Sequence, residues 1–508
     1  MIFTPTPEQQ LIYDAAVQTK DNLIVQALAG AAKTSTIVGI AERVRGFPLL
    51  AVCFNKRIAD EMQERFNQSK ASHCAARTLN SIGHSAWGQA TGKRLVVEKG
   101  KMGDILKSLD LSAAESDAAR EAFTDIVQLS SRAKLYGYVP EGRYDEALHM
   151  ISREELQDVL ADAEYDPIAW SLLDQMLMKS IHMAYNGVID YDDQLYMTTL
   201  FGASLPRYRL TLIDEAQDLS PLNHQMIAHL VGDRRIIAVG DAFQSIYGFR
   251  GAVSDGMSVL RRRFKMKEFT LSISFRCPKE VIKKARSRAP YMQWAETAID
   301  GEVKEILRND SGPVTWGPNL FPRSCAVICR NNAPIFSLGL KLIRAGRPVT
   351  IRGMDISKRL IKILNEFGDH AMPRDELLEH LLRWRVAKLA EGKLSEETVE
   401  DRYTCLRVFA ETAENLGGAI AHAERLFASA GPIELLSGHK SKGLEWDHVF
   451  HLDPWRVPSK FAKGREELEQ EANLEYVITT RAKRTLTLID LEDFDLELVE
   501  PWVREAAA

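Results

Sequence analysis

Short apolar runs rich in β-branched residues recur along this chain, and between them apolar residues recur every three or four positions. The runs are typical of buried strands, and the intervening pattern is typical of amphipathic helices. The predicted strands are 22–28, 49–54, 210–213, 235–240, 269–274, 324–330, 348–352, 432–436 and 484–490. Because strands that alternate with helices form parallel sheets covered by helices, the expected fold class is α/β with parallel-sheet cores.

Two long segments interrupt this alternation, because their apolar residues follow only the helical period. Each segment predicts a mostly helical domain inserted into an α/β core. A chain of 508 residues is also too long for one hydrophobic core. The expected domains are a first core (1–80 and 187–265) with insert 81–186, a second core (266–353 and 431–495) with insert 354–430, and a tail (496–508).

Composition places the chain among ordinary globular proteins, with 45% hydrophobic residues, 27% charged residues and a net charge of −5. The negative charge argues against indiscriminate coating of nucleic acid but leaves room for a local basic groove. The basic runs 261–265 and 283–286 are candidates for one, although each is more simply a solvated helix face. No apolar run reaches the roughly 20 residues of a membrane helix, and the N-terminus lacks the apolar stretch of a secretory signal. We expect a cytoplasmic protein with no membrane partner.

The segment after the first predicted strand has the composition of a phosphate-binding loop. It reads Gly30, Ala31, Ala32, Lys33, Thr34 and Ser35, and a helical pattern follows it. In such loops backbone N–H groups and the helix N-terminus bind phosphate oxygens, the lysine reaches the β and γ phosphates, and the hydroxyl ligates Mg²⁺. We therefore expect Lys33 and Thr34 to take these roles.

Ala32 departs from the pattern, because the residue before the lysine is usually glycine. If the loop keeps its usual shape, Ala32 adopts a positive φ at a cost of about 1–2 kcal/mol, which weakens ATP binding roughly tenfold. Alternatively, Ala31 and Ala32 join the first turn of the following helix, where alanine is favoured. The small residues around Gly30 favour this relaxed loop.

Two predicted strands end in polar groups of fixed type. The strand 210–213 ends at Asp214 and Glu215, and the strand 235–240 is followed by Gln244. Carboxylates at the carboxyl end of a buried strand lie where open α/β sheets bind ligands. Asp214 is suited to hold Mg²⁺, and Glu215 is suited to orient or deprotonate a water. An acidic loop after a strand is the plainer interpretation of Asp214 and Glu215 alone. Together, the two strand ends indicate a nucleoside triphosphatase.

Several longer motifs occur in order and together resemble one family. They are FNK (54–56), DEAQD (214–218), VGDxxQSIYGFRGA (239–252), HKSKGLEW (439–446) and LxYVxxTRAK (474–483). This set resembles the superfamily 1 DNA helicases of the UvrD/Rep type, and its wording is similar to the F-box DNA helicase branch. The resemblance spans residues 6–488. It implies two RecA-like cores, ATP and Mg²⁺ as cofactors, and single-stranded DNA and its junctions with duplex as partners.

The resemblance also implies roles for residues around the nucleotide. Gln9 would read the adenine edge and Phe275 would stack on its face, while Glu445 would lie near the ribose. Lys33, Thr34, Asp214 and Glu215 would hold the phosphates, the metal and the attacking water. Gln244 would touch the γ-phosphate, and Arg276 and Arg481 would reach across from the second core as arginine fingers.

On the DNA side, the resemblance implies a set of residues that line the single strand. They are Phe54, Asn55, Lys56, Thr78, Asn80, Phe249, Arg250, His439 and Lys440. Aromatic faces such as Phe249 bind any base by stacking, which suits a protein that ignores sequence. Asn80 stands where the family commonly has histidine, so this position departs from the family pattern.

These features favour an ATP-dependent translocase on single-stranded DNA that unwinds duplexes or strips bound protein. Movement in the 3′→5′ direction rests on the resemblance alone. Two alternatives stay open: a slow ATP switch on DNA, which Ala32 favours, and a motor subunit that works with a separate nuclease or loading partner.

Overall fold

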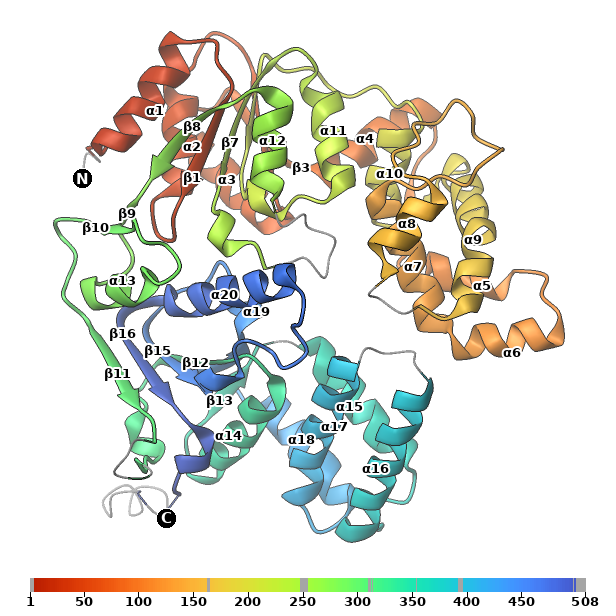
Figure 1. The fold of residues 1–508 in the computed structure, drawn as a ribbon, viewed down its shortest axis with the longest axis vertical. Helices are drawn as coiled ribbons and strands as arrows, with labels where there is room; N and C mark the ends of the chain where they lie inside the picture. The colour runs from red at the N-terminus through yellow and green to blue at the C-terminus, as the bar shows by residue number, and fades with distance from the viewer. Residues whose placement is uncertain are drawn as a thin grey trace. The chain divides into compact units, whose positions relative to one another are not determined.

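The computed structural model describes residues 4–161, 165–246, 255–308, 312, 314–352, 354–391, 396–496 and 498. The chain forms two compact units, residues 1–272 and 273–508 (Figure 1). Among the described helices, none combines the length and apolar character needed to cross a membrane.

The first unit is built on a six-stranded sheet with the order β3-β2-β6-β7-β1-β8. All neighbouring strands in it are parallel. Its strands are β1 (Leu23–Ala27), β2 (Leu49–Cys53), β3 (Cys74–Thr78), β6 (Leu210–Ile213), β7 (Arg235–Gly240) and β8 (Lys267–Leu271). Because these strands are parallel, the residues that follow β1, β2, β6 and β7 all lie at one edge of the sheet.

Helices cover both faces of this sheet, and the alternation along each strand supplies both cores. On one face Leu23 and Val25 pack with side chains of α1 (Pro7–Gln18), α2 (Lys33–Arg43) and α3 (Lys56–Gln68). On the other face Ile24 packs in a second cluster. The helices of that cluster are α4 (Leu79–Thr91), α10 (Asp193–Leu200), α11 (Pro221–Val231) and α12 (Gly256–Phe264).

A helical subdomain interrupts the first unit and has a hydrophobic cluster of its own. Its helices are α5 (Lys101–Lys107), α6 (Ala113–Glu121), α7 (Phe123–Tyr136), α8 (Arg153–Val159) and α9 (Pro167–Tyr185). Two short parallel strands, β4 (Val96–Val97) and β5 (Val188–Ile189), pair where the chain enters and leaves it.

The second unit has its own six-stranded sheet, with the order β11-β16-β15-β12-β14-β13 and parallel pairing throughout. Its strands are β11 (Glu302–Ile306), β12 (Cys325–Cys329), β13 (Val349–Ile351), β14 (Ile433–Ser437), β15 (Trp446–Leu452) and β16 (Ala482–Ile489). Helices α13 (Lys279–Ala285), α14 (Asn332–Arg344), α19 (Gly438–Ser441) and α20 (Arg465–Thr479) accompany it, with the short strands β9 (Ile273–Ser274) and β10 (Gln293–Trp294).

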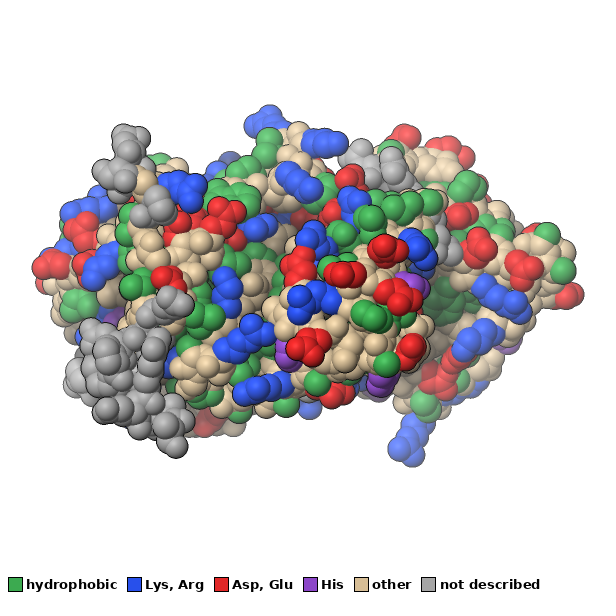
Figure 2. All heavy atoms as spheres, turned by 90° about the horizontal axis from the view of Figure 1, so that it is seen from below, with side chains coloured by type: hydrophobic (Ala, Val, Ile, Leu, Met, Phe, Trp, Pro, Cys, Tyr) green, Lys and Arg blue, Asp and Glu red, His purple; other side chains and the backbone are tan. Residues whose placement is uncertain are grey.

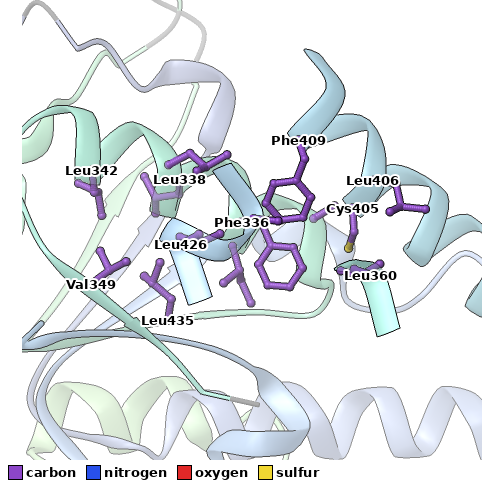
Figure 3. Packing of buried hydrophobic residues seen from close by; sticks show 14 of the residues in the cluster. Phe336, Leu338, Leu342, Val349, Leu360, Cys405, Leu406, Phe409, Leu426 and Leu435 are labelled. Carbon is purple, nitrogen blue, oxygen red and sulfur yellow. The ribbon is translucent and has the colours of Figure 1, made fainter. Parts of the chain in front are cut away.

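The helical segment of the second unit shares one hydrophobic core with its sheet. Its helices are α15 (Met354–Glu366), α16 (Arg374–Glu391), α17 (Glu396–Glu411) and α18 (Leu416–Ala428). Figure 3 shows Phe336 of α14 beside Phe409 of α17, with Leu426 of α18 close to Leu435 of β14. The rings of Phe336 and Phe409 are stacked, with centroids 5.9 Å apart. This segment is therefore packed as part of the second unit.

The α/β class and its parallel sheets are as predicted, but two boundaries need correction. The sequence placed residues 81–91 in the first insert, whereas α4 packs on the first sheet and the helical subdomain begins after it. The sequence placed residues 266–353 in the second core and read 269–274 as one of its strands. Instead β8 pairs with β1 in the first sheet, and Ser272 separates it from β9. Strands β3, β11 and β15 were not predicted, since their polar residues weaken the apolar pattern.

Candidate nucleotide and nucleic-acid site

The loop between β1 and α2 has the geometry of a phosphate cradle. Gly30 and Ala32 both have positive φ, at 73° and 60°, and α2 begins directly afterwards at Lys33. The Ala31 N–H donates to the Leu28 carbonyl at 3.0 Å, which closes the turn. Residues that alternate into the left-handed region aim successive N–H groups at one point and form an anion-binding nest. The first N–H groups of a helix also lack intrahelical acceptors, so this loop fits phosphate oxygens.

The relaxed loop favoured from the sequence is wrong. Ala32 lies outside α2 with φ 60° and ψ 39°, in the left-handed region. Its carbonyl accepts the Thr36 N–H at 2.9 Å, so it caps the helix in the conformation that glycine adopts freely. The usual shape of the loop is therefore kept, at a backbone cost of about 1–2 kcal/mol.

The predicted catalytic pair comes together at the edge of the first sheet. Lys33 Nζ lies 3.9 Å from Glu215 Oε2, and their side chains are 13% and 21% exposed. Gln217 Nε2 donates to the same Glu215 oxygen at 2.6 Å. Glu215 itself has a positive φ of 51°. The two charges therefore face each other within the space beside the loop.

Asp214 is buried beside this pair, and its side chain accepts the Glu215 N–H at 3.0 Å. Burial raises the pKa of Asp214 to about 7, and the nearby Glu215 carboxylate adds to the shift, while Lys33 opposes it. A buried carboxylate beside a half-buried one suits a cation, because the two negative charges repel each other. Among the described residues no cluster of three or more His, Cys, Asp or Glu could hold a metal. Mg²⁺ needs only one or two such ligands beside phosphate oxygens, so Thr34 and Asp214 fit it.

A buried hydrogen-bond network, missing from the predicted site, connects Glu215 to Gln244. Gln217 Oε1 accepts the Asp241 N–H at 2.9 Å, and Gln244 Nε2 donates to Asp241 Oδ2 at 2.7 Å. Gln26 Nε2 donates to the other Asp241 oxygen at 3.1 Å. Burial raises the pKa of Asp241, although the charge of Lys33 and the Gln244 bond lower it. The position of Asp241 directly after the strand was the available signal for this network.

Gln9 is buried at the N-terminal end of α1. Its backbone N–H and Oε1 form a capping box with Thr6, and Nε2 donates to Thr36 Oγ1 of α2 at 3.1 Å. Both ends of the amide therefore bind protein groups. Its role at the adenine stays a prediction.

The predicted DNA-side residues of the first unit lie at the carboxyl ends of β2 and β3. Phe54 is 40% exposed. Asn55 and Thr78 are helix caps, since their side chains accept the N–H groups of Ile58 and Ser81. Lys56 opens α3 directly after Asn55.

Asn80 follows in α4, and its amide donates to the Tyr191 carbonyl and to Gln194 Oε1 at 2.9 and 3.0 Å. Its side chain thus connects α4 to the segment around α10. Phe249 and Arg250 lie outside the described residues.

In the second unit, Phe275 is 46% exposed and Arg276 Nε donates to Glu445 Oε2 at 2.5 Å. Arg481 is only 1% exposed. Its guanidinium donates to the carbonyls of Val477 and Leu444 and to Thr480 Oγ1. The two predicted arginine fingers thus differ sharply in burial.

His439 and Lys440 lie in α19, and Lys440 lines a cavity of about 420 Å³. The cavity is also lined by Arg330 and Asn332, at the end of β12, which sequence reasoning missed. Asn332 donates to Asp401, and Arg330 is held by Glu471 and Glu397.

The fold and the loop geometry are those of a nucleotide-binding α/β protein, and two family models identify the family. Residues 7–265, just over half of the chain, match the UvrD/REP helicase N-terminal domain. Residues 358–493 match the UvrD-like helicase C-terminal domain. The chain therefore belongs to the UvrD/Rep family of ATP-dependent DNA helicases.

Named relatives agree with this assignment. The F-box DNA helicase protein 1 of Schizosaccharomyces pombe is 24% identical, over 96% of this chain and 57% of its own length. UvrD2 of Mycobacterium tuberculosis, named an ATP-dependent DNA helicase, is 25% identical over 94% of this chain and 77% of its own. Rep of Escherichia coli is 26% identical over 56% of this chain and 45% of its own. The chain thus spans little more than half of the S. pombe relative.

Among solved structures, the arterivirus nonstructural protein 10 helicase matches at 12% identity and a TM-score of 0.34. The match covers 94% of this chain and 62% of that one, and its score is too low to carry an argument about the fold.

Proposed function

We propose that this chain is an ATP-driven motor that moves along single-stranded DNA and uses that movement to unwind duplexes or strip bound proteins. The observation that carries the proposal is the pairing of Lys33 with Glu215 beside a left-handed phosphate loop. The network from Glu215 through Gln217 and Asp241 to Gln244 supports it. A site that only binds nucleotide needs no such connected carboxylate.

Each residue of this site has a physical task in hydrolysis. Lys33 supplies a fixed positive charge for the β and γ phosphates, and Thr34 and Asp214 would hold Mg²⁺, which neutralises developing charge. Glu215 is placed to orient or deprotonate the attacking water. Gln244, at the far end of the network, would transmit the state of the γ-phosphate toward the DNA side.

The arginines of the second unit would complete the site. In phosphoryl transfer an arginine finger stabilises the charge of the transition state. Such an arginine typically raises kcat by about 10³-fold or more. If Arg276 and Arg481 act in this way, hydrolysis depends on closure of the two units around ATP, and repeated closure moves them along a strand.

ATP hydrolysis in four conditions tests the motor directly: no nucleic acid, single-stranded DNA, duplex DNA and single-stranded RNA. Strong stimulation by single-stranded DNA alone is the expected result. Equal rates in all four would contradict a DNA motor.

Direction forms a separate part of the proposal, and 3′→5′ movement rests on family likeness alone. Partial duplexes that carry only a 3′ tail or only a 5′ tail decide it. Faster unwinding of the 5′-tailed duplex would reverse this assignment.

A slow ATP switch on DNA is the second candidate, and the left-handed Ala32 favours it. Strain in the phosphate loop weakens nucleotide binding without removing it. The same four-condition assay separates the two, since a switch would bind DNA in an ATP-dependent way with little stimulated turnover.

A further inference from the structure

A basic cavity lies at the edge of the first sheet opposite the phosphate loop. The residues around it precede or open the strands: Asn22 precedes β1, Phe47 lies just before β2, Arg209 precedes β6, and Arg235 opens β7. Its volume is about 640 Å³. Because parallel strands all enter the sheet at this edge, the cavity is a full strand length away from Lys33 and Glu215.

The charge of this cavity is strongly one-sided. Among its lining residues that the structure describes, six are cationic and one, Asp233, is acidic. The cationic residues are Lys20, Arg43, Arg45, Arg209, Arg234 and Arg235. On the face drawn in Figure 2, by contrast, Lys and Arg side chains are interspersed with Asp and Glu. The cavity is thus a local exception in a chain of net charge −5.

Two of the six cationic side chains bind or pack against neighbouring protein groups. Arg235 donates to the carbonyls of Asp21, Ala16 and Ala15 and so holds the end of α1. Arg43 lies over the Tyr13 ring, 4.1 Å from its centroid. Neither needs a ligand to account for its position.

The other four cations are less well neutralised. Lys20, Arg45 and Arg209 form no ion pair among the described residues, although Arg45 Nε donates to the Glu42 carbonyl at 2.6 Å. Arg234 lies 3.4 Å from Asp233, whose side chain is 94% exposed, so that pair is weakened by solvent. Cations that line one cavity repel one another and together attract a polyanion.

Apolar groups accompany these charges. Val17 is 55% exposed at the cavity, and Ala16, Val44 and Phe47 also line it. The Arg209 guanidinium lies over the Phe47 ring, 5.4 Å from its centroid. An arginine stacked on a ring can still bind a carboxylate through its N–H groups. A ligand that satisfies both features carries several negative charges and at least one apolar side chain.

We propose that this cavity binds an acidic peptide segment of a partner protein, with its carboxylates on Lys20, Arg45, Arg209 and Arg234 and an apolar side chain against Val17 and Phe47. Arginine forks match carboxylates in geometry, and a concave pocket with an apolar floor suits a peptide side chain. A nucleic-acid backbone would satisfy the charges, but the exposed Val17 is aliphatic and has no aromatic face on which a base could stack. The proposal goes beyond the motor function and does not depend on it.

Fluorescence anisotropy with the full chain tests this binding. The probe is a short fluorescein-labelled peptide of consecutive aspartates that ends in phenylalanine, measured at low and moderate salt. Wild type should bind it, and affinity should fall as salt rises. Arg209→Glu combined with Arg234→Glu should weaken binding by roughly tenfold or more, because two attractive pairs become repulsive. Lys20→Glu alone, at an exposed position after α1, should give an intermediate loss of peptide affinity. This single change on the surface keeps the test valid if the double variant does not fold.

Arg120→Glu is the matched control, since this arginine of α6 has a 78% exposed side chain far from the cavity in sequence. It should bind the peptide as wild type does. All variants should keep basal ATP hydrolysis, because the phosphate loop lies at the other edge of the sheet. A probe with serine in place of phenylalanine should bind more weakly.

Three results would overturn the proposal: no binding of the peptide by wild type, equal binding by wild type and both cavity variants, or equal binding of the two probes. A fourth result would also overturn the proposal: oligo-dT displaces the peptide from wild type, and the cavity variants lose affinity for oligo-dT as they do for the peptide. That result would assign the cavity to nucleic acid.

Discussion

At the scale of single residues, the backbone conformation of Ala32 bears on how tightly the phosphate loop can bind ATP. Ala32 adopts the left-handed conformation in the loop before Lys33, although the Cβ of an alanine disfavours that conformation. Loop conformations that cannot bind phosphate compete with this one, and alanine gives them an advantage that glycine would not. The residue therefore lowers the population of the binding-competent loop while leaving its shape intact.

Ala32→Gly should accordingly tighten ATP binding, by up to roughly tenfold, because it removes about 1–2 kcal/mol of strain. Fluorescent-nucleotide titration measures the dissociation constant. Ala31→Gly is the matched control, since Ala31 is buried and is not among the positive-φ residues. Tighter binding in both variants, or in neither, would show that backbone strain at Ala32 is not the cause.

Lys33 and Glu215 should fail in different ways when they are replaced. Lys33→Ala removes a charge from the phosphates and should weaken binding and turnover together. Glu215→Gln keeps the shape and the contact with Gln217, so ATP should still bind while turnover falls at least about a hundredfold. DNA-stimulated hydrolysis and nucleotide titration measure the two effects. Glu64→Gln is the control, because Glu64 accepts a hydrogen bond from Gln68 at the surface of the protein and its replacement should leave turnover unchanged. Near-normal turnover in Glu215→Gln would place the catalytic carboxylate elsewhere.

Arg276 and Arg481 call for separate treatment because one is accessible and the other is buried. Arg276→Ala should slow turnover by roughly a thousandfold with little change in Tm, as for an arginine finger. Arg481→Ala should lower both turnover and Tm, because the carbonyls of Val477 and Leu444 lose their donor. Steady-state hydrolysis and thermal unfolding separate these outcomes. Unchanged turnover in a folded Arg276→Ala protein would contradict its role as a finger.

At the scale of elements, the helical subdomain of the first unit is joined to its core by buried charges. Asp193, at the start of α10, accepts from Lys101 of α5 at 2.5 Å and from Lys134 of α7 at 2.8 Å. Lys134 also contacts Asp190 at 2.7 Å, and these lysines are fully buried. The subdomain has its own apolar cluster, and Ile181 and Ala184 of α9 also pack with the core of the first unit. Apolar contacts and this polar network therefore both attach it.

Removal of one member of that network should be costly. Lys134→Met leaves Asp193 and Asp190 with less compensation in a buried site, and we expect a loss of about 3–5 kcal/mol in the free energy of unfolding. Urea unfolding followed by circular dichroism measures the loss. Lys107→Met is the control, because that lysine pairs with Asp104 at the surface and should cost less than about 1 kcal/mol. Equal losses would show that the buried network does not stabilise the attachment.

At the scale of the whole molecule, local patterns predicted more than long-range pairings did. The phosphate loop, the two polar strand ends and the two helical segments follow from short motifs or from periodicity. The assignment of β8 to the first sheet does not, because a strand's partner is chosen by packing far away in the sequence. The conformation of Ala32 depends on an energy difference of about 1–2 kcal/mol, which its neighbours in the sequence do not reveal.

Buried polar contacts were missed for a related reason. Lys101, Lys134 and Asp193 look like solvated charges in the sequence, and only the packing of α5, α7 and α10 brings them together. The Gln217–Asp241 contact likewise joins the ends of two strands, and no spacing rule gives it. The sequence predicted which residues would take part in the chemistry, whereas their buried hydrogen-bond partners follow only from the fold.

Each unit also contains a buried histidine, and these two residues predict a pH dependence of the free energy of unfolding. His224 of α11 and His451 of β15 are 3% and 1% exposed. Both His224 ring nitrogens and Nε2 of His451 lack hydrogen-bond partners among the described residues. Burial lowers the pKa of each to about 4 from a usual value of 6.5, and nearby cations, Arg263 and Lys284 respectively, lower it further.

The free energy of unfolding should therefore fall as pH drops from 6.5 toward 4. In this window the unfolded chain takes up a proton at each histidine and the folded chain does not. Each histidine then contributes up to about 1.4 kcal/mol per pH unit, or about 2 kcal/mol by pH 5. Asp214 acts in the opposite sense, because its raised pKa favours the protonated folded form as pH falls. The histidine contribution must therefore be isolated by substitution.

Urea unfolding of the full chain between pH 7.5 and pH 5 should show a shallower pH dependence for His224→Leu and for His451→Leu than for wild type. The shallower dependence arises because each substitution removes one group that binds a proton only in the unfolded chain. His149→Gln, at an exposed position, should keep the dependence of wild type. Parallel curves for all four proteins would show that neither buried ring stays neutral in the folded chain, and that the acid sensitivity arises from other groups.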